Sequence, residues 1–303
     1  MNKLTEICRQ YSCDFTFDAS LKDYNTFKIG GNCSLLIDIV SAEAALAVLK
    51  HIENIGIKHT VIGNGSNIIV PDEGYYGVVL LFKNKFSDIT VNGNEMECEA
   101  GASLKSACLA ALENGLSGLE FAWGIPGTVG GALCMNAGAY HGEMSDAVVS
   151  AVCSDKGEPR FIPKSEMALS YRNSVFVPRS DENTAPKILK VTFNLTPKAP
   201  EKIEERMNLL LKLRTDKQPL DYPSLGSTFK RPAHDVFAAA LIQECGLKGM
   251  SIGGAQVSWK HSGFIVNTGG ATAKDLLTLA GEVQRIVFEK TGHRLELEPR
   301  IIE

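Results

Sequence analysis

The chain has 303 residues, of which 44% are hydrophobic and 22% are charged, and its formal net charge is -4. These values are typical of globular proteins, so intrinsic disorder and fibrous repeats are poor interpretations, and the length predicts at least two domains. The mild acidity argues against a nucleic-acid or anionic-membrane binder, since either class needs a clustered basic face. Glycine accounts for 28 residues, and where these glycines cluster is more informative than their number.

The N-terminal residues MNKLTEICRQYSCDF contain no uninterrupted apolar stretch and no small-residue cleavage site, so they do not indicate a signal peptide. No apolar run approaches the roughly 18 residues that a membrane-spanning helix needs. The eight cysteines include no CxxC pair and no compact His/Cys cluster, which argues against a metal site. Several lie in apolar runs, as buried free thiols do, and a reducing cytoplasmic compartment suits them best.

The first two thirds of the chain alternate between helical and strand patterns. Helices are expected after the N-cap residues Ser41 and Ser103, ending near Gly56 and Gly115. Apolar stretches bounded by turn residues predict strands, and these lie at residues 58–62, 68–70, 78–82, 89–91, 96–100, 148–154 and 187–195.

The pattern changes near residues 197–200, where two prolines suit an interdomain linker. Residues 201–214 follow as a charged, amphipathic helix. Thr272, with an aspartate three residues later, resembles a capping box for a long helix that ends before Gly292. The interleaved helices and strands, with antiparallel hairpins, predict a mixed α and β architecture.

The first segment with ligand-binding chemistry is VIGNGSNIIV, residues 61–70. Its two glycines permit positive φ, so successive backbone N–H groups can converge on an anion, and Ser66 and Asn67 add donors. The segment is not a Walker A loop, because no Gly-Lys-Ser/Thr follows, and Ile68 occupies the position of the last glycine of GxGxxG. A tight turn between strands is an equally good interpretation of this segment alone.

The second segment is GIPGTVGGALCMNAGAYHGEM, residues 124–144, which contains six glycines. Such a run is poor material for a core helix, because each interior glycine costs roughly 0.5–1 kcal/mol relative to alanine. Its many apolar neighbours argue against a plain surface loop. The segment therefore predicts close approach of a flat or phosphorylated ligand to the backbone.

Three shorter segments carry polar chemistry. In YRNS, residues 171–174, the planar fork of the arginine could clamp a carboxylate or phosphate, although a surface salt bridge is the simpler interpretation. In GSTFKRP, residues 226–232, the serine lies outside any GxSxG elbow or triad, so it is either a proton donor near cations or a turn residue. In the tail, Glu296 and Glu298 would share one face of an extended segment, and an edge strand with a solvated face is the alternative.

Taken together, these segments resemble the UDP-N-acetylenolpyruvoylglucosamine reductases, the MurB flavoenzyme family of peptidoglycan precursor synthesis. The match covers nearly the whole chain, and several motifs in one order are far more specific than any one of them. The matching motifs, followed by the tail, are NTFKIGG at 25–31, GNGSN at 63–67, GIPGTVGG at 124–131, NAGAY at 136–140, YRNS at 171–174 and GSTFK at 226–230.

The resemblance implies an α+β chain with a vanillyl-alcohol-oxidase (PCMH-type) FAD-binding fold. It implies an FAD-binding region over residues 1–198, made of two α+β subdomains split near residues 75–80, and a C-terminal substrate domain over 199–303. FAD would be noncovalent and NADPH the cosubstrate. In the family reaction NADPH reduces FAD, and hydride then reaches C3 of UDP-N-acetylglucosamine enolpyruvate, giving UDP-N-acetylmuramate.

Family roles carry over to matching positions. Ser227 matches the serine that protonates C2, and Arg172 and Glu298 match the residues that act on the substrate carboxylate and the enolate. Glu298 is preferred to Glu296, although the tail proline is displaced from the usual family pattern. The expected substrate-binding residues are Tyr171, Lys230, Arg231 and Arg300. The expected FAD-binding residues are Val61, Ile62, Gly63, Asn64, Gly65, Ser66, Asn67, Gly124, Ile125, Pro126, Gly127, Thr128, Gly130, Gly131, Ala132, Asn136, Ala137, Gly138, Ala139 and Ile188.

Two departures and two alternatives accompany this interpretation. Many members have asparagine where this chain has Arg231, and the stretch after YRNS is short, which indicates the branch without a substrate-capping tyrosine loop. A flavin oxidase of the same fold that uses O2, or a non-catalytic flavin- or nucleotide-binding regulator, are the competing hypotheses. The presence of all three candidate catalytic residues argues against both. We expect a monomer that binds a nucleotide sugar, with no nucleic-acid or membrane partner and no metal.

Overall fold

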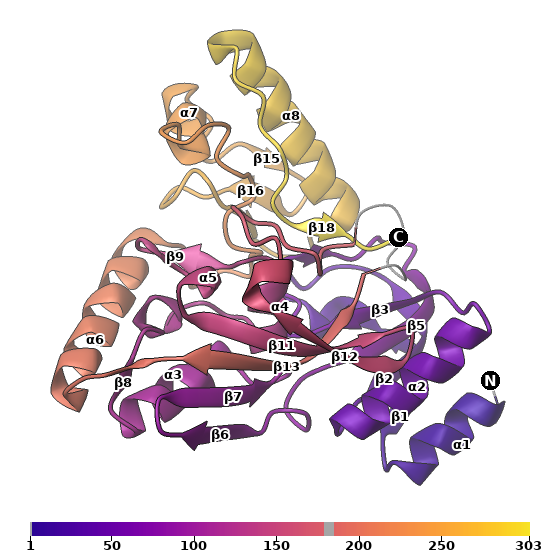
Figure 1. The fold of residues 1–303 in the computed structure, drawn as a ribbon. Helices are drawn as coiled ribbons and strands as arrows, with labels where there is room; N and C mark the ends of the chain where they lie inside the picture. The colour runs from indigo at the N-terminus through magenta and orange to yellow at the C-terminus, as the bar shows by residue number, and fades with distance from the viewer. Residues whose placement is uncertain (1, 179–184) are drawn as a thin grey trace. The chain divides into compact units, whose positions relative to one another are not determined.

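The computed structural model describes residues 2–178 and 185–303, and Figure 1 traces the chain through its helices and strands. The described chain divides into two compact units. The first contains Met1–Ala19, Ser34–Asn64 and Tyr76–Lys212, and the second contains Ser20–Cys33, Gly65–Tyr75 and Leu213–Glu303. Two excursions of the N-terminal half thus belong with the C-terminal part, while the domain limits at 198 and near 75–80 stay a prediction.

The first unit is built on two sheets. A five-stranded antiparallel sheet has the order β12-β11-β13-β7-β6, and a four-stranded sheet has the order β1-β2-β5-β3, in which β3 and β5 are parallel. The strands are β1 Asp14–Ser20, β2 Asn32–Asp38, β3 His59–Ile62, β5 Tyr75–Leu81, β6 Ile89–Asn92, β7 Glu95–Glu99, β11 Val148–Asp155, β12 Glu158–Pro163 and β13 Lys187–Asn194.

Helices and short strand pairs complete this unit. The pairs are β8 Leu116–Ser117 with β14 Thr196–Pro197, and β9 Gly138–Ala139 with β10 Gly142–Glu143. The helices are α1 Asn2–Gln10, α2 Ala42–Asn54, α3 Leu104–Glu113, α4 Val129–Cys134, α5 Met144–Ala147 and most of α6 Pro200–Lys217, together with the 3-10 turns Glu120–Ala122 and Lys164–Glu166.

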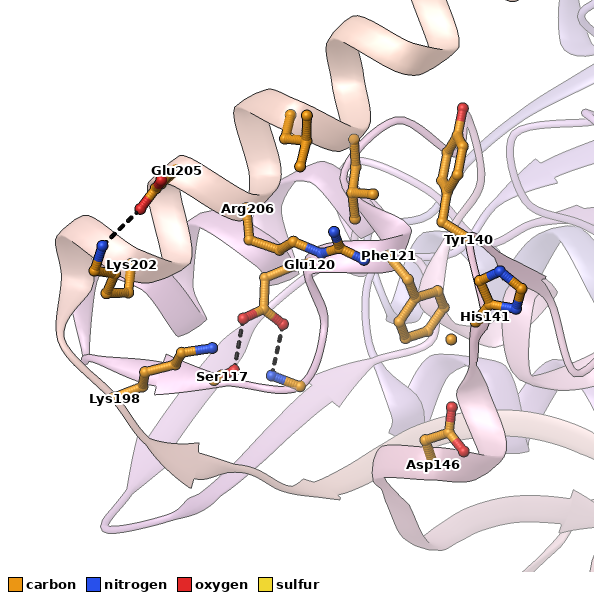
Figure 2. Close-up of a pocket in the computed structure, with 14 residues that line it drawn as sticks. Ser117, Glu120, Phe121, Tyr140, His141, Asp146, Lys198, Lys202, Glu205 and Arg206 are labelled. Atoms are coloured by element: carbon orange, nitrogen blue, oxygen red, sulfur yellow. Dashed lines mark hydrogen bonds and ion pairs between the residues drawn. The ribbon is translucent and has the colours of Figure 1, made fainter.

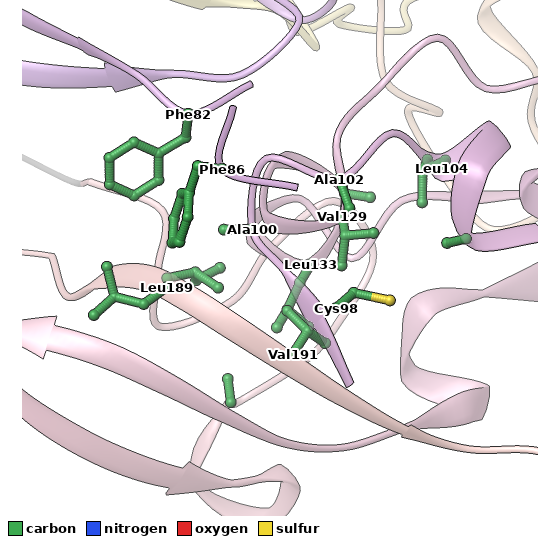
Figure 3. Packing of buried hydrophobic residues seen from close by; sticks show 14 of the residues in the cluster. Phe82, Phe86, Cys98, Ala100, Ala102, Leu104, Val129, Leu133, Leu189 and Val191 are labelled. Atoms are coloured by element: carbon green, nitrogen blue, oxygen red, sulfur yellow. The ribbon is translucent and has the colours of Figure 1, made fainter. Parts of the chain in front are cut away.

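One part of the core of the first unit lies where α4 packs against the five-stranded sheet. Figure 3 shows Val129 and Leu133 of α4 among the same buried side chains as Leu189 and Val191 of β13. All four are buried. This packing fixes residues 129–134 of the glycine-rich segment on the sheet, because well-packed apolar side chains are held in one arrangement.

The second unit has a smaller core around helix α8, Ala273–Thr291. The core includes Phe27 and Ile29 from the NTFKIGG motif, and Asn267 donates a hydrogen bond from Nδ2 to the carbonyl of Phe27 over 2.9 Å. The remaining elements of the unit are the 3-10 turn Leu21–Tyr24, helix α7 Ala238–Glu244, a sheet of β15 Ser251–Ile252, β16 Ala255–Val257 and β17 Ile265–Asn267, and the parallel pair of β4 Ile68–Ile69 with β18 Arg300–Ile301.

The predicted caps are confirmed. The Ser41 and Ser103 hydroxyls accept hydrogen bonds from backbone N–H groups three residues on, which satisfies donors that the first turn leaves open. Thr272 and Asp275 form the reciprocal capping box, and Gly292 ends α8 in the left-handed conformation with φ of 74°. The eight cysteines are free thiols, and all except Cys134 are buried.

Two local predictions are wrong. Residues 197–200 are not a linker, because Pro197 lies in strand β14 and Pro200 begins α6, where a missing N–H costs little. The glycine-rich segment does contain a core helix, α4, despite Gly130 and Gly131. A Cβ on Gly130 would lie 2.7 Å from the Ala100 Cβ. Close approach to the neighbouring backbone therefore requires glycine there, and burial of α4 offsets its low helix propensity.

Within the described ranges, none of the helices combines the length and apolar character that crossing a membrane requires.

Candidate active site

The turn after β3 packs directly on the glycine-rich segment. A Cβ on Gly63 would lie 2.3 Å from Thr128 Oγ1, so only glycine fits at this position. Asn64 donates a hydrogen bond from Nδ2 to the Pro126 carbonyl over 2.8 Å. Thr128 in turn accepts from the Gly131 N–H as the N-cap of α4. The structure thus brings together five of the residues predicted to hold the cofactor.

The two predicted cofactor segments differ in whether their backbone N–H groups are free to bind a ligand. Within residues 2–178 and 185–303, the N–H groups of residues 63–67 donate no hydrogen bond. The N–H groups of Val129 and Gly130, in contrast, donate to the carbonyls of Ala102 and Ala100 over 2.8 and 2.9 Å. A row of unused N–H groups is what an anion such as a pyrophosphate requires, so the 63–67 turn fits this role better than the start of α4.

Gly65, in the second unit, is a second position in this turn where only glycine fits. Gly65 has φ of +63°, and a Cβ there would lie 2.0 Å from the Tyr24 carbonyl oxygen. The Gly65 carbonyl accepts from the Thr26 N–H over 3.1 Å. The conformation and the crowding both exclude a side chain, which explains glycine at this position without reference to a ligand.

The side chain of Asn136 links the NAGAY motif to the residues around the YRNS motif by hydrogen bonds. Its side chain is fully buried, donates from Nδ2 to the Ser170 carbonyl over 3.1 Å, and accepts at Oδ1 from the Ser145 N–H over 2.9 Å. Ser174 adds a hydrogen bond from Oγ to the Cys134 carbonyl over 2.6 Å. Because both amide atoms are used within the protein, Asn136 has a structural role as well as its predicted place near the cofactor.

Arg172 is held over the same segment. It has a left-handed conformation with φ of 53°, its Nη2 donates to the Gly138 carbonyl over 3.1 Å, and its guanidinium lies 5.0 Å from the centre of the Tyr171 ring. Left-handed conformations are unfavourable for residues other than glycine and cluster at functional sites. The strained turn and the hydrogen bond together fix the direction of the Arg172 side chain, which is predicted to bind the substrate carboxylate.

Trp123 is a candidate that the sequence interpretation missed. It directly precedes Gly124, its indole Nε1 is buried, and within the part of the chain that the structure describes this N–H has no hydrogen-bond partner. Lys105 lies with Nζ 5.7 Å from the ring centre. A buried donor without an acceptor is costly, so this N–H fits a ligand acceptor. Its place beside the glycine-rich segment was the available sequence signal.

The predicted cofactor residues differ in how far they are exposed to a ligand. Ile188 is 7% exposed and packs in the core of the first unit from strand β13, where its neighbour across the sheet is Cys153. Ile62 and Ala132 are also buried in this unit, whereas Pro126 and Gly131 are exposed. The exposed positions and the free N–H groups therefore define the surface on which a cofactor would lie.

In the second unit, the Ser227 segment runs antiparallel to the tail. Lys230 N–H donates to the Glu296 carbonyl over 2.9 Å, and Glu298 N–H donates to the Thr228 carbonyl over 3.0 Å. The adjacent Thr228 is buried, and its Oγ1 accepts from the Ile265 N–H over 2.9 Å. This pairing fixes the backbone of Ser227 beside the tail, while Ser227 itself stays partly exposed.

The tail also joins the GNGSN turn. Asn67 donates from Nδ2 to the Glu298 carbonyl over 3.3 Å, and Arg300 N–H donates to the Asn67 carbonyl over 3.0 Å. Strand β18 then pairs in parallel with β4. The tail is therefore not the free edge strand of the alternative interpretation, because strand pairs flank it. Ser227, Glu298, Arg300 and Asn67 lie in one part of this unit.

The two tail glutamates have different surroundings. The Glu296 side chain is 76% exposed and forms an ion pair with Lys230 over 3.6 Å, whereas Glu298 is half-buried. Arg231 is exposed, and its guanidinium lies 4.7 Å from the centre of the Phe237 ring. Glu298 therefore has the more restricted environment that a catalytic carboxyl group needs.

Comparisons with known proteins agree with this arrangement. A family model described as "FAD binding domain" matches residues 34–156, and one described as "UDP-N-acetylenolpyruvoylglucosamine reductase, C-terminal domain" matches residues 218–302. A crystal structure of UDP-N-acetylenolpyruvylglucosamine reductase (MurB) from Thermus caldophilus has a TM-score of 0.79 and 34% identity, covering 96% of this chain and 99% of that one. These matches confirm the predicted fold class.

Curated relatives extend the match over nearly the full length. The UDP-N-acetylenolpyruvoylglucosamine reductase of Clostridium perfringens (strain SM101 / Type A) is 44% identical over 290 residues, covering 95% of this chain and 93% of the relative. That of Clostridium botulinum (strain Hall) is 47% identical over 286 residues, covering 94% and 91%. The chain therefore belongs to the UDP-N-acetylenolpyruvoylglucosamine reductase (MurB) family of FAD-dependent oxidoreductases.

Proposed function

We propose that this protein reduces UDP-N-acetylglucosamine enolpyruvate to UDP-N-acetylmuramate with NADPH, and that Ser227, Arg172 and Glu298 carry the chemistry. The observation that supports this most is the antiparallel pairing of residues 228–230 with 296–298. It holds a serine hydroxyl and a carboxyl group on neighbouring backbone segments, which suits proton delivery to a developing enolate.

The FAD fits the residues of this chain. When bound, FAD supplies hydride transfer from NADPH to C3 of the enolpyruvyl group. The unused N–H groups of residues 63–67 would bind its pyrophosphate, and the indole N–H of Trp123 would donate to one of its polar atoms. Gly124–Gly131 and 136–139 would contact it through backbone and small side chains. The attachment is noncovalent.

The chain's polar side chains act on the substrate. Hydride addition at C3 moves charge onto the enolpyruvyl carboxylate, and Arg172 binds that group more strongly as the charge develops, which lowers the barrier. Ser227 donates a proton to C2, and Glu298 hydrogen-bonds the intermediate. Tyr171, Lys230, Arg231 and Arg300 bind the remainder of the nucleotide sugar, where the cations meet its diphosphate.

Two further assignments belong to this proposal. The eight free thiols favour a reducing cytoplasmic location, and the protein acts as a monomer. We also place it in the family branch without a capping-tyrosine loop. Part of the segment on which that assignment depends, residues 179–184, lies outside the described residues.

An anaerobic titration tests the function. NADPH is expected to bleach the flavin absorbance of the purified protein, and the enolpyruvyl nucleotide is expected to restore it. The control replaces the nucleotide with air-saturated buffer. Rapid reoxidation by O2 with no response to the nucleotide would favour the oxidase, and a yellow protein that NADPH does not bleach would favour the non-catalytic regulator.

Replacing Trp123 with phenylalanine tests the fit to FAD separately from turnover. The ring is kept, so only the N–H donor is lost, and we expect FAD to bind roughly 5- to 30-fold more weakly, as for loss of one hydrogen bond to a buried group. Apoprotein titrated with FAD gives the dissociation constant. The chain has two tryptophans, so the exposed Trp259→Phe substitution is the matched control, and it should leave the constant unchanged.

A further inference from the structure

The NTFKIGG motif has no role in the function proposed above, although it lies wholly within the second unit with Ser227. Asn25 is buried, and its Nδ2 donates to the carbonyls of Leu21 and Ile29 over 2.9 and 2.8 Å. Its Oδ1 accepts from the Ile29 N–H over 3.3 Å. Three hydrogen bonds from one buried side chain make this loop rigid, so the next residue, Thr26, has a fixed position.

Thr26 bonds to two segments that carry the proposed chemistry. Its N–H donates to the Gly65 carbonyl over 3.1 Å, and Gly65 lies in the turn that would bind the flavin pyrophosphate. Its Oγ1 donates to the Ser224 carbonyl over 2.6 Å, and Ser224 lies three residues before Ser227. Every residue type except proline has the N–H for the first bond, whereas the second bond needs the hydroxyl. The hydroxyl of Thr26 therefore links the cofactor turn to the Ser227 segment.

The hydrogen bonds that pair this segment with the tail begin one residue after Ser227. Across the described part of the chain, the backbone groups of Gly226 and Ser227 form no hydrogen bond. Gly226 has φ of 76°, and a Cβ there would meet no atom within 4 Å, so this position can change conformation without a clash. On the N-terminal side the nearest fixed groups are the buried Leu225 side chain and the Ser224 carbonyl. The Thr26 hydroxyl therefore limits how far the Ser227 hydroxyl can shift.

The cofactor turn is bonded to the other candidate catalytic segment as well. Asn67 Nδ2 donates to the Glu298 carbonyl, and the Glu298 N–H donates to the Thr228 carbonyl. With the two bonds of Thr26, these contacts close a ring of four segments in the second unit: the N-terminal motif, the cofactor turn, the tail and the Ser227 segment. A closed ring holds each segment from two sides, and catalytic groups need this kind of support to keep their geometry.

We propose that Thr26 is a positioning residue for the protonation of C2, and that its hydroxyl holds Ser227 in place for this step. The inference rests on the proposed function, because it presupposes that Ser227 donates the proton. In that step the Ser227 O–H bond breaks, the electron pair of the enolate forms the C2–H bond, and the serine alkoxide then takes a proton from water. Proton transfer requires the donor within hydrogen-bond distance, and a displacement of about 1 Å can cost about 10²-fold in rate.

The test measures both half-reactions by stopped-flow spectroscopy in holoenzyme that carries Thr26→Val. Valine keeps the branched shape of threonine and removes the hydroxyl, so we expect reoxidation by the enolpyruvyl nucleotide to be about 10- to 100-fold slower. Reduction of the flavin by NADPH needs no proton at C2 and should be unchanged. Thr26→Ser keeps the donor and should restore the reoxidation rate to within about threefold of wild type. Thr26→Ala also removes the hydroxyl and gives the same comparison if the valine variant does not fold.

Two variants control for the loss of a hydroxyl elsewhere. Thr268→Val, in the same unit, removes a hydroxyl that donates to the Gly254 carbonyl over 3.0 Å. Ser117→Ala, in the first unit, removes a hydroxyl that donates to Glu120 over 2.6 Å, as Figure 2 shows. Each control should leave both rates unchanged. The flavin absorbance spectrum and thermal unfolding check that every variant is folded and loaded.

The decisive measurement combines Thr26→Val with Ser227→Ala. If Thr26 acts through Ser227, its substitution should change the reoxidation rate by less than about twofold once the serine hydroxyl is absent, because coupled residues are not additive. A full additional loss in the double variant would overturn the inference. So would a wild-type rate in Thr26→Val, an equal slowing of both half-reactions, or a failure of Thr26→Ser to restore the rate. If Ser227→Ala alone reoxidises at the wild-type rate, the proposed role of the serine fails first, and this inference fails with it.

Discussion

Ser227→Ala is expected to leave the reduction of the flavin by NADPH unchanged and to slow its reoxidation by the enolpyruvyl nucleotide by about 10²- to 10⁴-fold, the range for loss of a general acid. The physical reason is that the serine hydroxyl is the proposed source of the C2 proton, whereas the first half-reaction needs no proton at that carbon. Ser227 is partly exposed, and the side chain that bonds to the neighbouring strand in this segment is that of Thr228. Removing the Ser227 hydroxyl should therefore not disturb the fold.

Stopped-flow spectroscopy of the two half-reactions measures this effect. Ser251→Ala in the same unit is the matched control. The Ser251 residue is exposed, and its hydroxyl bonds only with nearby residues, donating to the Gly249 carbonyl and accepting from Gln256 Nε2. This substitution should leave both rates unchanged. A Ser227→Ala protein that reoxidises at the wild-type rate would remove the serine from the mechanism. A loss in both half-reactions alike would assign it to binding or folding instead.

The sequence predicted local structure well because local rules determine it. The N-cap serines and the Thr272 capping box each depend on a few neighbouring residues. Helix α4 escaped prediction because its stability comes from packing against β13, far away in the chain, and not from helix propensity. Its Gly130 is explained by Ala100, a contact that spacing could not reveal.

The same limit applied to the candidate site. The motifs identified the family and most of the residues, yet which backbone groups are free for a ligand depends on hydrogen bonds between distant segments. Among the described residues, the backbone N–H groups of residues 63–67 donate no hydrogen bond, whereas those of Val129 and Gly130 donate to carbonyls of residues 100–102. The burial and the unused N–H of the Trp123 indole depend on packing in three dimensions, so the sequence could signal this residue only through its place beside the glycine-rich segment.

Glu298→Gln and Glu296→Gln are the two variants that decide which of the tail glutamates is catalytic. Their side-chain volumes are nearly unchanged, so each substitution removes charge and acidity alone. We expect Glu298→Gln to slow flavin reoxidation by about 10²- to 10³-fold, the usual effect of losing one group that stabilises transition-state charge. Glu296→Gln should change the rate less than about threefold, because its exposed ion pair with Lys230 contributes little.

Single-turnover reoxidation by the enolpyruvyl nucleotide measures both variants, and reduction by NADPH serves as the internal control. The physical basis of the asymmetry is that Glu298 is half-buried and its backbone is fixed at two points, by the Thr228 carbonyl and by Asn67 Nδ2. Glu296 is fixed at one carbonyl, and its side chain points to solvent. If Glu296→Gln caused the larger loss of rate, the catalytic carboxyl group would be that of Glu296, which pairs with Lys230, and not that of Glu298.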